Sequence, residues 1–234
     1  KSKKNVVMLT PESDKKLFLI DAYAIIFRAY FAFAKNPRVN SQGLNTSAAF
    51  GFTNSLMEVI KKEKPTHIAV VFDPPGGSTS RKETFEEYKA NRNETPEGII
   101  TNIIPIKRIV DAFNIPIIEM DGYEADDVIG AMSKVAESKG YLTYMVTPDK
   151  DYGQLVTERS YMYKPGRGGD PAQIWGPKEV CEKFELDNVS QVVDYLGLMG
   201  DASDNIPGMP GIGPKTASKL LKEFGTMENI FANT

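Results

Sequence analysis

Nine acidic residues are grouped along the sequence in a way that could bind metal ions. They are Asp21, Asp73, Glu124, Asp126, Asp127, Asp149, Asp151, Asp201 and Asp204. So many carboxylates repel one another unless cations neutralise them. Oxygen ligands without histidine or cysteine partners favour hard cations such as Mg²⁺ or Mn²⁺. Two such ions about 4 Å apart could activate a water molecule and stabilise the leaving oxygen of a phosphodiester.

Three of these acids follow apolar runs, which explains how residues distant in sequence could meet. Asp21, Asp73 and Asp149 come after the runs at 17–20, 67–72 and 141–146. Such runs are typical of buried parallel strands, whose carboxyl ends lie along one edge of a sheet, where ligands bind. Each acid alone could equally cap a helix or lie in a solvated loop, but the complete set favours one metal-binding cluster.

Glycines and prolines are concentrated near the C-terminal end, directly before a helical stretch. The residues of interest there are Gly208, Gly211, Gly213, Lys215 and Thr216. Glycine lets a backbone approach a phosphate closely, and free N–H groups at a helix start can bind that phosphate. Such contacts hold a nucleic-acid backbone without reading its sequence. Taken alone, the segment could also be an ordinary turn between helices.

The elements that must position these residues alternate between strand and helix. Strands are expected at 17–21, 67–73, 115–119 and 141–146, and helices at 22–34, 46–62, 97–113 and 124–138. This alternation predicts an α/β fold with a mostly parallel sheet flanked by helices. The charged stretch 81–92 is also expected to be helical, and 161–176 should form a hairpin or an irregular excursion.

The chain is expected to divide into three parts. Residues 1–16 form a disordered leader, residues 17–176 the α/β core, and residues 177–234 a helical region. The single cysteine, Cys181, excludes an internal disulfide framework and a multi-cysteine zinc site. No apolar run approaches the roughly 20 residues of a membrane span, so a cytoplasmic location is expected.

The formal net charge of −3 conceals an uneven distribution of charge. Without the nine clustered acids, 22 acidic residues face 28 basic ones, so the rest of the surface is mildly basic. This balance permits DNA binding without requiring it.

Several long motifs occur in an order that resembles one known family. The segment 198–208 running into 211–217 resembles its helix–hairpin–helix signature, and further matches are Glu124-Ala125-Asp126-Asp127, Asp149-Lys150-Asp151 with Gln154-Leu155-Val156, and Tyr88-Lys89-Ala90-Asn91-Arg92. The family is that of the flap endonucleases, and the similarity is closest to the 5′→3′ exonuclease domain of bacterial DNA polymerase I. It covers the chain from about Leu17 to its end.

The resemblance implies a 5′ nuclease (PIN-like) core with a two-metal site. One ion would be served by Asp21, Asp73, Glu124, Asp126 and Asp127, and the other by Asp149, Asp151, Asp201 and Asp204. The ions would be Mg²⁺ or Mn²⁺. The hairpin backbone, including Gly208, Gly211 and Gly213 with Lys215 and Thr216, would bind duplex phosphates, in the family often with a K⁺ ion.

A helical arch is implied over the active site, at about 76–102. By position, Lys89 and Arg92 match basic residues that face the reacting phosphodiester, with Arg81 slightly upstream. Tyr88 matches an aromatic residue of the arch that would stack on unpaired nucleotides, and Arg28 a basic residue that contacts DNA. Without the family match, 81–92 would be read as a solvated helix and Arg28 as part of a surface salt bridge.

Two positions depart from the family pattern. Pro148 stands where many members have glycine, and Ser80 replaces an aromatic residue before Arg81. Neither change removes an acid of the signature.

The implied function is structure-specific hydrolysis of DNA or RNA-primer phosphodiesters at 5′ ends, nicks and 5′ flaps, in replication and repair. The chain would be a monomeric, truncated fragment of a nucleoid-associated bacterial polymerase. Two alternatives are a metal-dependent ribonuclease of the related small α/β class, which leaves the glycine hairpin unexplained, and a catalytically inert DNA-binding domain.

Overall fold

The computed structural model describes residues 15–75, 79–166 and 170–233. Its main sheet has six strands in the order β3-β2-β1-β4-β5-β6. They are β1 (Lys16–Asp21), β2 (His67–Phe72), β3 (Ile117–Glu119), β4 (Leu142–Val146), β5 (Ser160–Lys164) and β6 (Gln173–Trp175). All neighbours pair in parallel except β5 and β6, which are antiparallel. The predicted mostly parallel sheet is confirmed, and β5 and β6 form the hairpin expected at 161–176.

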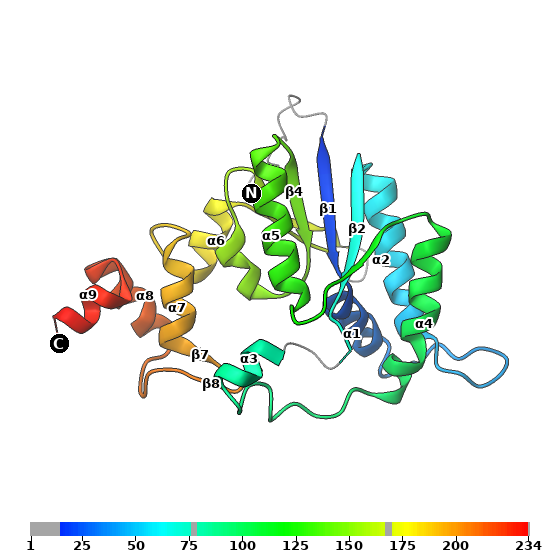
Figure 1. Cartoon of the computed structure of the whole chain (residues 1–234), viewed down its shortest axis with the longest axis horizontal. Coiled ribbons are helices and arrows are strands. Elements are labelled where there is room, and N and C mark those ends of the chain that lie inside the picture. Colours follow the sequence, from blue (N-terminus) through cyan, green and yellow to red (C-terminus); the bar gives the residue numbers. More distant parts are fainter. Residues whose placement is uncertain (1–14, 76–78, 167–169, 234) are drawn as a thin grey trace.

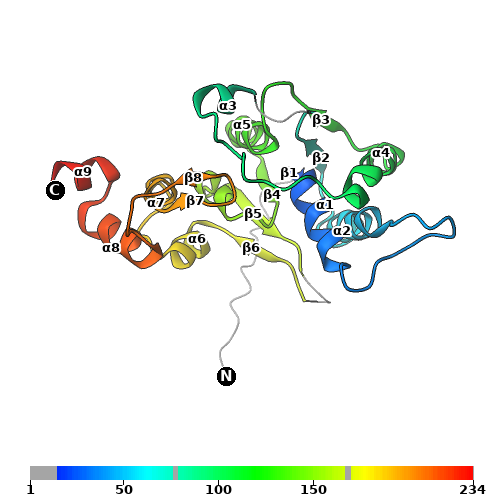
Figure 2. The ribbon, with the colours of Figure 1, turned by 90° about the horizontal axis from the view of Figure 1, so that it is seen from below.

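Helices cover both faces of this sheet (Figures 1 and 2). The helices of the described residues are α1 (Ala22–Ala32), α2 (Ser47–Glu63), α3 (Thr79–Thr84), α4 (Glu97–Ala112), α5 (Ala125–Ser138), the 3₁₀ helix η1 (Lys150–Leu155), α6 (Pro177–Phe184), α7 (Gln191–Met199), α8 (Pro214–Phe224) and α9 (Met227–Ala232). Two short strands, β7 (Gly200–Asp201) and β8 (Ile206–Pro207), pair between α7 and α8. The C-terminal region is therefore helical apart from this small ladder.

Alternating side chains of the strands build one core on each face of the sheet. Phe18 and Ile20 of β1 pack with α1, α2 and α4, whereas Leu19 between them packs with α5 and the C-terminal helices. This is the period of two that a strand buried on both faces requires. The two cores hold β1, β2 and β4 side by side. The carboxyl ends of these three strands point toward the viewer in Figure 2.

Two expectations need adjustment at the level of elements. The helix expected at 81–92 ends at Thr84, and turns follow it. Lys89 has a left-handed backbone (φ 58°), which a helix running on to Arg92 could not contain. The expected leader 1–16 lies mostly outside the described residues, but Lys16 is already the first residue of β1.

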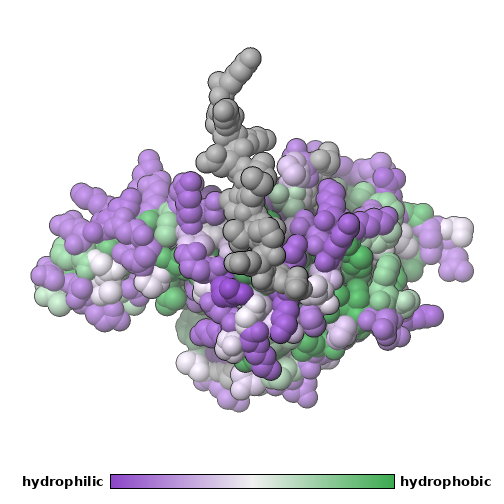
Figure 3. Space-filling view, turned by 90° about the horizontal axis from the view of Figure 1, so that it is seen from above, coloured by the Kyte–Doolittle hydropathy of each residue, from purple (hydrophilic) through white to green (hydrophobic). Residues whose placement is uncertain are grey.

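Within the described ranges no helix has the length and apolar character needed to cross a membrane. Hydrophilic residues cover much of the face seen from above (Figure 3).

Candidate active site

The carboxyl ends of β1, β2 and β4 deliver Asp21, Asp73 and Asp149 to one edge of the sheet, as predicted. Asp21 ends β1 and caps α1, because its Oδ1 accepts a hydrogen bond from the Ala24 N–H (3.1 Å). Asp73 follows β2 and accepts from the N–H of Ala125, the first residue of α5 (2.7 Å). Asp149 lies just beyond β4 and caps η1. The short caps fix each carboxylate close to its strand.

Asp21 lies in an environment that disfavours its negative charge. It is 8% exposed, and burial together with the nearby charge of Asp73 raises its pKa to about 7, against the opposing hydrogen bond from Ala24. The hydroxyls of Thr147 (3.2 Å) and Tyr152 (3.0 Å) donate to its other oxygen. These two hydroxyls were not anticipated from the sequence, although both belong to the segment that carries Asp149.

The acidic motif 124–127 forms the start of α5. Glu124 precedes the helix, and its N–H donates to the Asp127 side chain (3.1 Å) in a capping box. The positive end of the helix dipole favours acids at this place. Burial also raises the pKa of Asp126, partly opposed by the charge of Arg81.

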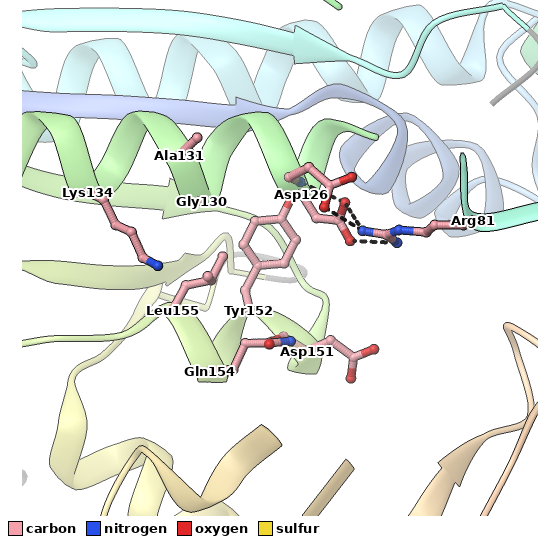
Figure 4. Close-up of a pocket in the computed structure, with 10 residues that line it drawn as sticks. Arg81, Asp126, Gly130, Ala131, Lys134, Asp151, Tyr152, Gln154 and Leu155 are labelled. Carbon is pink, nitrogen blue, oxygen red and sulfur yellow. Dashed lines mark hydrogen bonds and ion pairs between the residues drawn. The ribbon is translucent and has the colours of Figure 1, made fainter. Parts of the chain in front are cut away.

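Three basic residues lie among these carboxylates. Arg81 pairs with Glu124 (2.9 Å), Asp126 (3.3 Å) and Asp127 (2.6 Å). Figure 4 shows its guanidinium facing Asp126. Lys89 pairs with Glu124 (2.6 Å). Burial opposes the charge on Arg81, but the pKa of Arg81 is raised because Asp126 and Glu124 attract that charge.

Arg92 lies on the other side of the site, where it pairs with Asp204 (2.5 Å). The structure thus brings all three predicted basic residues to the predicted acids.

Tyr88 lies between Glu124, at the start of α5, and Asp204, beyond β7. It is 4% exposed, and its hydroxyl lies 3.0 Å from Glu124 and 3.1 Å from Asp204 while accepting a hydrogen bond from Arg81 (2.9 Å). The buried ring has no free face on which an unpaired nucleotide could stack. Tyr88 therefore organises the acids in this structure rather than offering a stacking surface.

The second group of acids is Asp149, Asp151, Asp201 and Asp204. Its members lie at the start of η1 and on or just after β7. Burial and the charge of Asp149 raise the pKa of Asp151 to about 7, with Lys150 opposing and Asp201 adding to the shift. Although burial opposes it, the pKa of Asp201 is lowered because Ser203 donates to its carboxylate. One buried oxygen of Asp151 has no hydrogen-bond partner among the described residues.

This donor set is suited to hard divalent cations. It offers carboxylate oxygens, one of which, in Asp151, is buried and accepts no hydrogen bond within the described residues. It also includes two carboxyl groups, those of Asp21 and Asp151, whose ionisation is opposed by burial and by neighbouring negative charge. In the described parts of the chain, however, no three His, Cys, Asp or Glu side chains form a ready-made ion cage. Arg81, Lys89 and Arg92 compensate the negative charge instead.

The hairpin glycines differ in what they do. A Cβ on Gly208 would lie 2.3 Å from the Met199 backbone, so Gly208 is needed for the close approach of α7 and β8. Gly211 has φ 79°, and a Cβ on Gly211 or Gly213 would meet nothing within 4 Å. Gly213 caps α8, and Lys215 and Thr216 are exposed in its first turn. Gly211 and the start of α8 are thus open to a ligand.

Arg28 has a partner that its sequence context did not indicate. Its guanidinium donates to the backbone carbonyls of Pro165 (2.7 Å) and Gly166 beyond β5. This ties α1 to the β5–β6 connection.

A cavity of about 370 Å³ extends from the acids along α5 and η1 (Figure 4). Its lining runs from Arg81, Asp126 and Asp151 past the ring of Tyr152 to Lys134. The space beside the carboxylates is therefore large enough for part of a nucleotide.

Two family models match the chain in succession. The 5′-3′ exonuclease N-terminal resolvase-like domain matches residues 16–185, and the 5′-3′ exonuclease C-terminal SAM fold matches residues 188–234.

Curated relatives agree with this assignment. The chain is 37% identical to the 5′-3′ exonuclease of Aquifex aeolicus, over 94% of this chain and 73% of that protein. It is 44% identical to DNA polymerase I of Deinococcus radiodurans, over 94% of this chain and 22% of the polymerase. The chain thus spans less than a quarter of that polymerase.

Solved structures share the fold. The D15 protein of bacteriophage T5 co-crystallized with metal ions superposes with a TM-score of 0.76 at 21% identity, over 93% of this chain and 79% of that one. The T5 D15 flap endonuclease in a pseudo-enzyme-product complex with DNA and metal ions gives a TM-score of 0.72 at 21% identity, over 93% and 78%. Taken with the family models and the Aquifex relative, these findings show that the chain belongs to the 5′-3′ exonuclease family of nucleases.

Proposed function

We propose that this chain hydrolyses phosphodiesters at DNA 5′ ends, nicks and 5′ flaps with two divalent cations, Mg²⁺ or Mn²⁺. The observation that carries the proposal is that two clusters of acidic residues meet three basic side chains at the carboxyl edge of the sheet. Acids alone would suit any cation site, and bases alone any anion site. Their combination suits a reaction in which both a metal ion and a phosphate are bound.

The nine predicted acids would hold the ions in two groups, one around Asp21, Asp73 and the start of α5, the other around Asp149 and Asp201. Bound cations would supply a water molecule of lowered pKa and polarise the phosphate. No covalent enzyme intermediate is needed.

The basic side chains have a second role in this proposal. When cations neutralise Glu124 and Asp204, Lys89 and Arg92 lose their carboxylate partners and can turn to phosphate oxygens. A positive charge held there stabilises charge that develops in the transition state. Arg81 can act in the same way beside the start of α5.

Duplex binding is assigned to the exposed segment at the start of α8. Gly211, Gly213, Lys215 and Thr216 leave the backbone open, and N–H groups at a helix start bind phosphate. The family's K⁺ ion would be held by backbone carbonyls of this hairpin. RNA-primer hybrids fit the same contacts, because these read no base sequence. A polymerase domain in the same full-length chain is part of the proposal, prompted by the polymerase relatives.

The direct test is incubation with a 5′-labelled flap duplex in Mg²⁺, in Mn²⁺ and with a chelator. We expect release of the flap with either metal and none with the chelator. Tight flap binding without cleavage in Mn²⁺ would contradict the nuclease proposal and indicate an inert DNA-binding domain. Cleavage of RNA but not of DNA flaps would contradict the proposed substrate.

A further inference from the structure

Two segments that are more than 100 residues apart lie against each other beside the acids. We call residues 87–92 the arch segment and residues 200–206 the ligand turn, because the latter carries Asp201 and Asp204. The N–H of Lys89 donates to the backbone carbonyl of Asp204 (2.9 Å). This bond joins the two backbones at the residues whose side chains are proposed to act.

Two asparagine side chains complete this contact. The amide of Asn205 donates to the backbone carbonyl of Glu87 (2.8 Å), and the amide of Asn91 donates to that of Ala202 (2.8 Å). Each segment thus contributes one asparagine that bonds to the backbone of the other. Neither bond uses a carboxylate side chain.

The neutral and the ionic contacts between these parts respond differently to ligands. The pairs of Lys89 with Glu124 and of Arg92 with Asp204 depend on free carboxylates, so bound cations would replace them. The three neutral bonds do not involve a charged group and can persist while the ionic ones are exchanged. They can therefore hold the arch segment in place when the basic side chains change partners.

We propose that Asn91 and Asn205 are positioning residues that fasten the arch segment to the ligand turn. They keep Lys89 and Arg92 beside the reacting phosphate once the acids are occupied by metal ions. This inference rests on the proposed nuclease function and assigns a role in it to two side chains outside the set of acids and bases.

The backbone of Asn205 allows a clean test of its side chain. Asn205 has φ 59°, a conformation that asparagine and glycine adopt more readily than other residues. Asn205→Gly therefore removes the amide donor without straining the turn. Asn114→Gly is the matched control, because Asn114 has φ 55° just after α4 and its side chain makes no hydrogen bond within the described residues.

The first measurement is amide hydrogen exchange in the free protein with chelator, which needs no activity. Because one hydrogen bond is lost, we expect the Lys89 amide to exchange about 3–10-fold faster in Asn205→Gly, with no change in Asn114→Gly. Asn91→Ala should have a similar effect, and the double variant a larger one. Unchanged exchange of the Lys89 amide in Asn205→Gly, in Asn91→Ala and in the double variant would overturn the proposal that these asparagines fasten the arch segment to the ligand turn.

The second measurement is single-turnover cleavage of a saturating flap duplex in Mn²⁺. Asn205→Gly should lower the rate constant roughly tenfold while duplex affinity stays within about threefold, as expected for a group that orients the transition state. A loss no greater than that of Asn114→Gly, or a loss confined to affinity, would overturn the positioning role. If the wild-type chain did not cleave at all, the proposed function and this role would both fail, but the exchange data would still test the contact.

Discussion

Lys89 combines a proposed catalytic charge with an unusual backbone, and the choice of variant must respect both. Its φ of 58° means that the small cost of a left-handed residue is already present. Lys89→Met keeps an unbranched apolar side chain that reaches as far as the lysine Cε, at a comparable backbone cost, and it removes the ammonium group. This makes methionine a sharper probe than alanine.

We expect Lys89→Met to slow single-turnover flap cleavage about 100-fold, since electrostatic groups of this kind contribute on that order. Duplex affinity should change little, because the charge acts on the reacting phosphate. Lys82→Met, an exposed lysine on α3, is the control and should behave as wild type. An equal loss of affinity and of rate would mean that Lys89 binds DNA without acting on the chemistry.

Asp21 gives a prediction about stability and pH. In the unfolded chain its carboxyl group titrates near 3.8, and burial raises its folded-state pKa to about 7. The folded protein therefore binds the extra proton, and ionisation of Asp21 destabilises the fold as the pH rises from about 4 to 7. Above pH 7 the penalty is fully present.

Asp21→Asn should thus stabilise the protein in chelator by about 1–3 kcal/mol at pH 8, or roughly 3–9 °C in Tm, and by less at pH 5. The asparagine Oδ1 can still accept from the Ala24 N–H, and Thr147 and Tyr152 can turn their hydroxyls to accept. Thermal melts at the two pH values test this, with exposed Asp111→Asn as the control. A variant less stable than wild type at pH 8 would show that the charge of Asp21 supports the fold.

At the scale of elements, two glycines of the hairpin before α8 are expected to have different roles, one in folding and one in DNA binding. Gly213 has an ordinary backbone (φ −100°) and open space around it, whereas Gly208 lies against the Met199 backbone. We expect Gly213→Val to weaken duplex affinity about tenfold by blocking close approach of phosphate, with the Tm nearly unchanged. Gly208→Val should instead lower the Tm by several degrees, since something in the backbone must move.

Fluorescence anisotropy with a labelled duplex and thermal melts of both variants distinguish these effects. Wild-type affinity of a folded Gly213→Val variant would place the DNA path elsewhere.

The elements also show what local sequence patterns could and could not predict. The apolar runs before Asp21, Asp73 and Asp149 identified the strands and the edge at which these acids meet. The expectation of a helix over 81–92 was right only as far as Thr84, the last residue of α3. Beyond it, bonds from Lys89, Asn91 and Arg92 to residues 202–204 accompany turns instead of a helix. Contacts between segments so far apart leave no local period in the sequence.

Burial of polar side chains was equally beyond prediction. Tyr88 belongs to a motif that suggested an aromatic residue available for stacking on nucleotides. In the structure its hydroxyl instead lies within hydrogen-bonding distance of Glu124 and Asp204. The donors to Asp21 and the asparagine contacts were missed for the same reason. They become visible only when the fold brings the segments together.

For the whole molecule, net charge is a poor guide to its partners. The formal charge of −3 includes nine acids gathered at one edge of the sheet. Arg81, Lys89 and Arg92 compensate part of the negative charge of these acids. Neutralising that edge with cations would leave a mildly basic surface, which suits a polyanion. Metal binding and DNA binding are therefore expected to reinforce each other.

The central claim, that this edge binds two catalytic cations, is tested most directly by counting bound Mn²⁺ by electron paramagnetic resonance. We expect two ions per wild-type chain and one in Asp149→Asn, whose flap cleavage should be nearly abolished while flap binding remains. No saturable Mn²⁺ binding by the wild type, or two ions and wild-type cleavage in Asp149→Asn, would contradict the account.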